Sequence, residues 1–167
     1  RTLCEDLFAQ CDARFETAKV NGRTGFTIHT DRGDLHAPLI VDALGWRRVL
    51  ATNGYQPPDA PLSRGLEVHP HAAEATSDDA LDVWVDRSLA PRGFAWRVPA
   101  GPEERIGVGS YEPRHHVREP TEDLAQRLGA EAERWQGNWF PHRLRPAAED
   151  GVFFCGDSAG HCFPLSG

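Results

Sequence analysis

The stretch GVFFCGDSAGHCFPLSG, residues 151–167, carries the clearest local pattern in the chain. A short apolar run at 152–155 is typical of a buried strand, and it leads directly into a glycine-rich segment at 156–160. Two hypotheses fit such a strand and loop. Either the loop presents a nucleophilic serine, or its backbone closes on a bound cofactor.

The segment 156–160 matches G-x-S-x-G, the nucleophile elbow of serine hydrolases. In that fold a helix follows the serine, and the acid and the histidine come later in the chain. Here Pro164 lies six residues after Ser158, where it would interrupt the helix, and only nine residues follow Ser158. These two features argue against a nucleophile elbow, and a serine hydrolase with Ser158 as nucleophile is kept as an alternative hypothesis.

The cofactor hypothesis assigns the same residues to ligand binding and not to catalysis. Gly156, Gly160 and Gly167 lack side chains, so ligand atoms can approach the backbone closely. The carboxylate of Asp157 can accept hydrogen bonds from sugar-like hydroxyl groups. A loop at the end of a strand is also where α/β sheets usually bind nucleotide cofactors.

Composition narrows the class of protein. The 167 residues are 40% hydrophobic, enough for a core, and they carry a net charge of −7 with arginines scattered among acids. This distribution argues against a nucleic-acid surface. The sequence has no apolar run long enough for a transmembrane segment and no complete set of metal ligands, so we expect a cytoplasmic protein without a metal. It starts at Arg1 and has no methionine, which indicates an internal piece of a longer protein.

The pattern along the chain predicts a mixed, strand-rich fold. A helix end is expected at 1–11, followed by β-rich runs at 13–20, 24–30 and 35–43, the last typical of a buried parallel strand. Loop-forming residues at 52–61 suggest a domain boundary. Beyond it we expect antiparallel strands at 64–75, 80–86, 93–98 and 105–111, a helix at 121–135 capped by Thr121, and strands at 138–144 and 152–155.

The stretch 151–167 resembles the flavin-closing segment of FAD-dependent oxidoreductases of the aromatic hydroxylase and geranylgeranyl-reductase type. Those proteins have a short strand, Gly-Asp, small residues, and then a proline and a glycine before a helix. The resemblance implies that Asp157 bonds the ribityl chain of FAD. It also implies that the segment's other small residues and its proline lie near the cofactor: Gly156, Ala159, Gly160, Pro164 and Gly167.

Two further stretches resemble the same family. LIVDALGWRRVL at 39–50 is similar to its strand ending in Asp/Ala-x-Gly before a basic residue, which implies that Asp42 and Gly45 form a turn near the dinucleotide. GFAWRVP at 93–99, with IGVG at 106–109, is similar to the reductases' aromatic-x-Trp strand and its glycine-bearing partner. Phe94 and Trp96 then become walls of a substrate pocket, although their alternation fits core aromatic residues equally well. Flavin-dependent halogenases carry two tryptophans in a related strand, and Phe94 stands at the first of them.

The family's glycine-rich pyrophosphate motif, G-x-G-x-x-G, is absent from these residues, so we expect the piece alone to bind FAD weakly if at all. The resemblance implies an α/β fold in which 1–55 and 146–167 are parts of a three-layer (ββα) FAD-binding domain. These parts flank an antiparallel β-rich substrate domain at 60–145.

The implied activity is that of an FAD-dependent oxidoreductase that uses NAD(P)H as electron source. It would reduce an isoprenoid-type double bond or oxidise a hydrophobic or aromatic substrate, and a flavin-dependent halogenase is an alternative. The expected partner is a small hydrophobic substrate, with peripheral membrane contact if that substrate is a lipid. No residue stands out in the sequence as the acid or base of the reaction.

Overall fold

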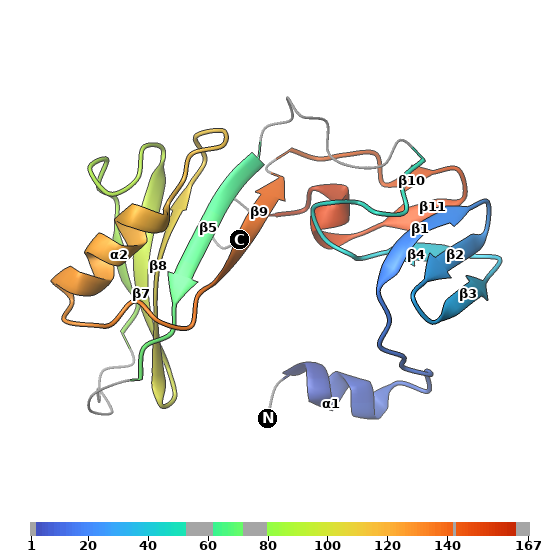
Figure 1. Ribbon diagram of the computed structural model, residues 1–167, viewed down its shortest axis with the longest axis horizontal. Coiled ribbons are helices and arrows are strands. Elements are labelled where there is room, and N and C mark those ends of the chain that lie inside the picture. The colour runs from blue at the N-terminus through green and yellow to red at the C-terminus, as the bar shows by residue number, and fades with distance from the viewer. Residues whose placement is uncertain (1–2, 53–61, 72–79, 142, 163–167) are drawn as a thin grey trace. The chain divides into compact units, whose positions relative to one another are not determined.

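The computed structural model describes residues 3–52, 62–71, 80–141 and 143–162 (Figure 1). The chain divides into two compact units, residues 1–39 and residues 40–167. Within the described ranges, neither helix has the length and apolar character needed to cross a membrane. The fold is mixed α/β and rich in strands, as the sequence predicts.

The first unit contains helix α1 (Leu3–Gln10) and an antiparallel meander of β1 (Val20–Thr24), β2 (Thr27–Thr30) and β3 (Gly33–His36). The predicted helix end is confirmed, and a small meander is present, but its bounds differ from those predicted. The run 13–20 is not a strand before Val20, the run 35–43 is divided between the end of β3 and a separate strand at 40–42, and the first turn lies at 25–26 and not at 21–22. Gly25 has φ +58°, which suits a tight turn, whereas residues 21–22 lie inside β1 at a β-bulge.

The second unit begins with a small sheet in the order β10-β11-β4, formed by β4 (Ile40–Asp42), β10 (Ala148–Glu149) and β11 (Val152–Phe154). Strands β4 and β11 are parallel, which confirms the predicted parallel strand. Only one face of this pair is buried. Ile40 and Asp42 point inward, while Val41 and Phe153 remain about half exposed at 54% and 51%.

A larger antiparallel sheet follows, in the order β6-β7-β8-β5-β9. Its strands are β5 (Leu62–Val68), β6 (Asp82–Trp84), β7 (Gly93–Ala100), β8 (Glu103–Ser110) and β9 (Gln136–Pro141). The predicted strands are present, but those expected at 64–75 and 138–144 end earlier, at Val68 and Pro141, and the strands are not paired in simple succession. Strand β5 lies between β8 and β9, so residues far apart in the sequence form the middle of the sheet.

Helix α2 (Arg118–Arg127) packs on one face of this sheet (Figure 1). Because side chains alternate along a strand, every second residue of the central strands points toward α2 and the residues between point to the opposite face. The core between the helix and the sheet consists of buried apolar residues: Leu66, Val68, Leu89, Ala90, Ala95, Ile106, Val108, Val117, Leu124 and Ala125. Helix α2 does not cover the opposite face of the sheet, and the candidate site described below lies on that face.

The predicted helix at 121–135 is wrong in its boundaries and in its cap. Thr121 is buried inside α2, where its hydroxyl donates to the carbonyl oxygen of Val117 at 2.7 Å. The helix starts earlier because Pro120 falls in the first turn, where no backbone N–H is needed. It ends at 127, just before Gly129, whose φ of +72° is left-handed. Trp135 lies beyond the helix and packs against the core.

Candidate functional site

Asp42, at the end of β4, organises the turn that follows it. Its side chain is fully buried, and Oδ1 accepts a hydrogen bond from the backbone N–H of Leu44 at 2.9 Å. Oδ2 accepts another from the N–H of Leu50, also at 2.9 Å. One carboxylate therefore holds both ends of the segment 44–50, which includes Gly45 with its left-handed φ of +87°.

The same carboxylate joins this turn to the glycine-rich loop. The hydroxyl of Ser158 lies 2.6 Å from Asp42 Oδ1 and 3.0 Å from the carbonyl oxygen of Gly45. Ser158 is fully buried, and within the described ranges no histidine side chain is hydrogen-bonded to it. This arrangement gives the serine a structural role. A nucleophile needs an accessible oxygen and a base beside it, so the hydrolase hypothesis has no support here.

The glycine-rich segment itself forms a 3-10 helix, η1 (Gly156–Ala159), directly after β11. Gly160 ends it with φ +70°, and a Cβ at this position would lie 2.0 Å from the carbonyl oxygen of Arg143. Gly156 is also left-handed, at φ +58°, but has open space where a Cβ would be. Both glycines are thus required by backbone conformation, and Gly160 is also required by packing.

Two arginines contact both the turn after β4 and the glycine-rich loop. Arg48 is buried with φ +52°, donates to the carbonyl oxygen of Ser158 at 3.2 Å, and lies over the ring of Phe154. Arg145 donates to the carbonyl oxygen of Trp46 at 3.0 Å. Burial, followed by the nearby charge of Arg48, lowers the pKa of Arg145. Arg48 also forms an ion pair with Glu149 at 3.3 Å, and Arg145 lies near the charge of Asp42, so the two cations help to hold the two loops together.

A cavity of about 550 Å³ lies between the free face of the large sheet and the segment that follows η1. Phe94 and Trp96 line it from β7, Tyr111 lies just beyond β8, and Asp157 and Cys162 line it from the glycine-rich loop. Burial raises the pKa of Tyr111. The predicted pocket residues and the predicted cofactor contact Asp157 therefore share one cavity, mainly apolar and aromatic, with few charged groups.

Glycines of the neighbouring strands explain how the indole of Trp96 fits on the sheet. A Cβ on Gly107 would lie 2.3 Å from Cζ2 of Trp96, and one on Gly109 would lie 3.3 Å from Cζ3. A Cβ on Gly65 of β5 would lie 3.9 Å from Cη2. These three glycines form a flat floor, called here the glycine platform, on which the ring rests. The ring thereby becomes a wall of the cavity, which the sequence pattern alone did not show.

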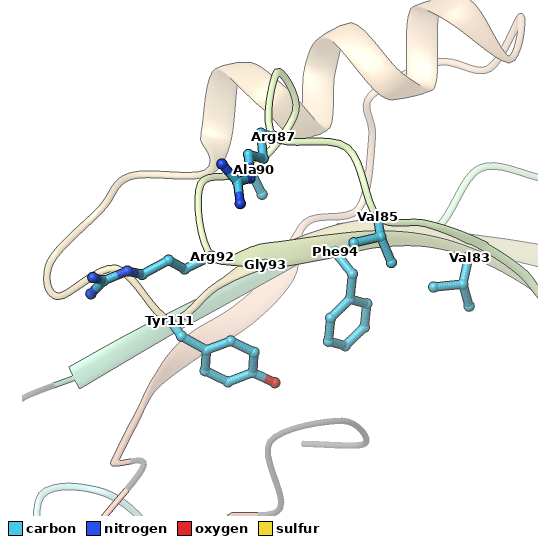
Figure 2. A pocket seen from close by; sticks show the side chains of 8 residues that line it. All are labelled: Val83, Val85, Arg87, Ala90, Arg92, Gly93, Phe94 and Tyr111. Atoms are coloured by element: carbon cyan, nitrogen blue, oxygen red, sulfur yellow. The ribbon is translucent and has the colours of Figure 1, made fainter.

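A second hollow of about 530 Å³ adjoins the cavity at the sheet edge and shares Val83, Phe94 and Tyr111 with it. Figure 2 shows that these three side chains project to the same side of the sheet. The charged residues of this hollow are Arg87 and Arg92, and Arg92 is paired with Glu112 at 3.4 Å. The aromatic pair Phe94 and Tyr111, with ring centroids 6.4 Å apart, thus lines both spaces.

The predicted cofactor-binding residues fall into three groups. Asp42 and Gly45 adjoin η1 through the hydrogen bonds of Ser158. Gly156, Asp157, Ala159 and Gly160 form η1 and its end, with Ala159 fully buried. Pro164 and Gly167 lie outside the described residues. The roles of all these residues toward a cofactor stay predictions.

Glu67 lines the cavity from β5 and was not predicted from the sequence. Its neighbours in space come from other strands, and local patterns do not reveal such contacts. One signal was present in the sequence: Glu67 alternates with the apolar core residues Leu66 and Val68, so it had to point to the opposite face.

No protein-family model matches this chain, and no curated protein matches its sequence. Solved structures do match. A geranylgeranyl bacteriochlorophyll reductase-like protein from Thermoplasma acidophilum is similar over 91% of this chain and 41% of its own, with a TM-score of 0.67 and 17% identity.

MibH, a tryptophan 5-halogenase, is similar over 97% of this chain and 33% of its own, with a TM-score of 0.64 and 16% identity. BrvH, a flavin-dependent halogenase from Brevundimonas sp. BAL3, is similar over 93% and 33%, with a TM-score of 0.58 and 17% identity. This chain thus spans less than half the length of each of these structures. Its fold is that of one part of the geranylgeranyl reductase-like and flavin-dependent halogenase structures, as the sequence resemblance implied.

Proposed function

We propose that these residues belong to an FAD-dependent oxidoreductase, in which the loop at Asp157 contacts the flavin and the neighbouring cavity holds a hydrophobic substrate. The observation that carries the proposal is the single cavity shared by Asp157, Phe94 and Trp96. A cofactor at the loop and a substrate against the aromatic wall would meet in that space. The likeness in fold to part of a reductase-like protein and of flavin-dependent halogenases supports it.

The residues present fit a flavin. Asp157 is half-buried at the cavity, and within the described ranges no residue donates a hydrogen bond to its carboxylate. It is therefore available to accept hydrogen bonds from ribityl hydroxyl groups. The backbone of η1 is held by Ser158 and Gly160 and needs nothing from the Asp157 side chain. The backbone of the loop is thus held by other groups while the carboxylate remains available, and such preorganisation favours binding.

A bound flavin would supply the two-electron redox chemistry, with NAD(P)H as the source of electrons and, where the substrate is oxidised, molecular oxygen as the oxidant. The chain's own residues would orient the cofactor through Asp157 and exclude water through the aromatic wall. Reduction of an isoprenoid-type double bond, or oxidation of a hydrophobic or aromatic substrate, suits such a cavity. We also propose that the protein is cytoplasmic and that its partner is a small hydrophobic substrate.

Halogenation is the second candidate, because MibH and BrvH share this fold. Product mass distinguishes the two activities. A reductase adds two hydrogen atoms to its substrate, whereas a halogenase replaces one hydrogen with chlorine or bromine and requires both the halide and molecular oxygen as oxidant. Phe94, standing where halogenases have a tryptophan, makes reduction or hydroxylation the first proposal.

The test is FAD binding by the natural polypeptide that contains these residues, measured by calorimetric titration of the flavin-free protein. Asp157→Ala should weaken FAD binding by about tenfold to a hundredfold, as expected for losing one charge-assisted hydrogen bond. Asp123→Ala, which removes an exposed carboxylate from α2, is the matched control and should bind FAD like the wild type. Equal affinity in the wild type and Asp157→Ala would remove the role assigned to Asp157.

A further inference from the structure

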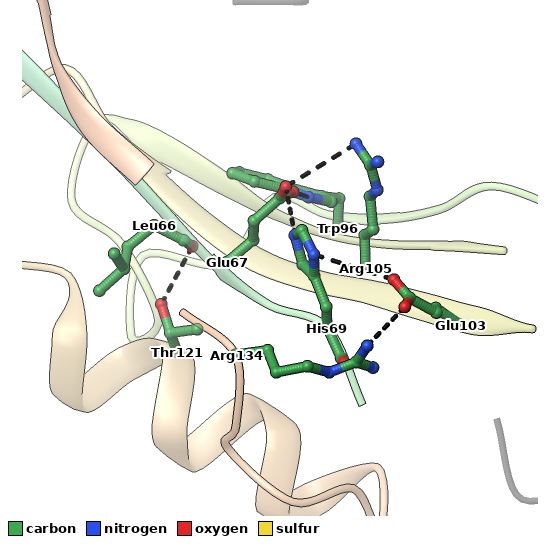
Figure 3. Close-up of polar contacts among 8 residues, drawn as sticks. All are labelled: Leu66, Glu67, His69, Trp96, Glu103, Arg105, Thr121 and Arg134. Atoms are coloured by element: carbon green, nitrogen blue, oxygen red, sulfur yellow. Dashed lines mark hydrogen bonds and ion pairs between the residues drawn. The ribbon is translucent and has the colours of Figure 1, made fainter. Parts of the chain in front are cut away.

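Glu67 joins the wall of the cavity to a polar cluster behind it (Figure 3). Its Oε2 accepts a hydrogen bond from the indole Nε1–H of Trp96 at 3.2 Å. Its Oε1 lies 2.8 Å from Nε2 of His69 and 3.9 Å from a guanidinium nitrogen of Arg105. Both carboxylate oxygens therefore have partners, and the side chain is only 15% exposed.

The partners of Glu67 are themselves held in place. His69 Nδ1 lies 4.0 Å from a carboxylate oxygen of Glu103. Arg134 forms an ion pair with Glu103 and donates to the backbone oxygen of His69. Figure 3 shows Glu67, His69 and Trp96 on the side of the sheet opposite Thr121. A carboxylate fixed at two oxygens cannot rotate freely, so the indole nitrogen that donates to it is fixed as well.

Two independent features thus restrain one ring. The glycine platform supports the flat face of Trp96 from below, and Glu67 holds its nitrogen at the edge. A restrained aromatic wall loses little conformational entropy when a ligand packs against it, so the restraint strengthens binding. Without the acceptor the indole N–H would be left partly buried and unpaired, which favours other ring orientations.

We propose that Glu67 is a positioning residue, which holds the indole of Trp96 on the glycine platform and thereby sets the affinity of the cavity for a hydrophobic ligand. This rests on the assignment of the cavity as the substrate site, but not on the binding of FAD. The role of Glu67 is that of a hydrogen-bond acceptor. It does not require a negative charge facing the ligand.

The test is a double-mutant cycle read by ligand affinity, with all-trans-retinol as the hydrophobic probe and quenching of tryptophan fluorescence as the signal. Glu67→Leu keeps a similar size without an acceptor and should weaken retinol binding by about tenfold. Glu67→Gln keeps an acceptor oxygen for the indole and should stay within about twofold of the wild type. In a Trp96→Phe background, which has no N–H to hold, Glu67→Leu should change affinity by less than about twofold.

A second readout needs no ligand. The difference in near-ultraviolet circular dichroism between the wild type and Trp96→Phe gives the signal of the Trp96 ring. That signal should be kept in Glu67→Gln and largely lost in Glu67→Leu, while far-ultraviolet circular dichroism verifies that each variant is folded. A Glu67→Leu protein that is folded and retains the signal would overturn the proposal.

Three binding results would also overturn it. If Glu67→Gln weakens retinol binding as much as Glu67→Leu, charge and not hydrogen bonding is what matters. If Glu67→Leu has the same effect in the Trp96→Phe background, Glu67 does not act through Trp96. A wild type that does not bind retinol would refute a hydrophobic site altogether. Because no step involves FAD, failure of the Asp157 test would leave these results interpretable.

Discussion

Asp42 offers the sharpest test of how the two loops are built, through the substitution Asp42→Asn. The carboxylate accepts hydrogen bonds from two backbone N–H groups and from the hydroxyl of Ser158. An asparagine has nearly the same shape but only one acceptor oxygen. Whichever way the amide is oriented, its NH₂ group faces at least one of these donors.

The cost follows from those contacts. Leaving one buried N–H without an acceptor costs about 1–3 kcal/mol. The remaining hydrogen bonds lose the extra strength that a charged acceptor gives, which adds roughly 1 kcal/mol to that cost. We therefore expect the free energy of unfolding to fall by about 3 kcal/mol. For a domain of this size or larger, about 2–4 °C per kcal/mol corresponds to a melting temperature lower by roughly 6–12 °C.

Thermal unfolding of the natural polypeptide, followed by circular dichroism, measures this shift. Asp123→Asn makes the same chemical change at an exposed position of α2 and should alter the melting temperature by no more than about 1 °C. A shift below about 2 °C for Asp42→Asn would contradict this prediction, because it would mean that the buried carboxylate does not hold the loops.

Two further predictions concern the loop that follows β11. Gly160→Ala should lower the denaturant midpoint markedly, because φ is +70° and the new Cβ would lie 2.0 Å from a carbonyl oxygen. Gly156 is also left-handed but has open space around it, so Gly156→Ala should lower the free energy of unfolding by only about 1–2 kcal/mol and shift the midpoint less. Equal midpoints for the two variants would contradict this packing. Burial, followed by the charge of Asp157, raises the pKa of the Cys162 thiol, so less thiolate is present at neutral pH and alkylation should be slower than at the exposed Cys155. Mass spectrometry of the alkylated protein should also show faster reaction at Cys162 in Asp157→Ala, and an unchanged or slower rate would contradict the effect of that charge.

Much of the fold could be predicted from local sequence patterns. The apolar runs at β4 and β11 gave the two strands, and the parallel pairing of β4 was correctly expected. The boundaries of α2 were predicted wrongly because threonine is a common N-cap residue, although Thr121 lies inside the helix. Pro120, in the first turn, and Gly129, just after the last turn, mark the two ends of the helix more reliably. Strand β10 has two residues, too few to leave a periodic signal.

The site was predictable only in part, because its contacts join distant residues. Asp157 and Trp96 were singled out through resemblance to known flavoproteins, and the structure brings both to one cavity. The bond between Asp42 and Ser158 spans 116 positions, and no local pattern encodes it. Glu67 reaches Trp96 across β8, a contact that depends on how β5, β7 and β8 are paired. Sequence periodicity tells which face of a strand a residue occupies, but not its neighbours on that face.

The most direct test of the central claim is the visible absorbance of the natural polypeptide as purified, beside Asp157→Ala and the control Asp123→Ala. We expect a yellow wild type with the absorption bands of an oxidised flavin, an equally yellow control, and an Asp157→Ala protein with much less bound flavin. A folded wild type that is colourless and stays so after addition of FAD would contradict it.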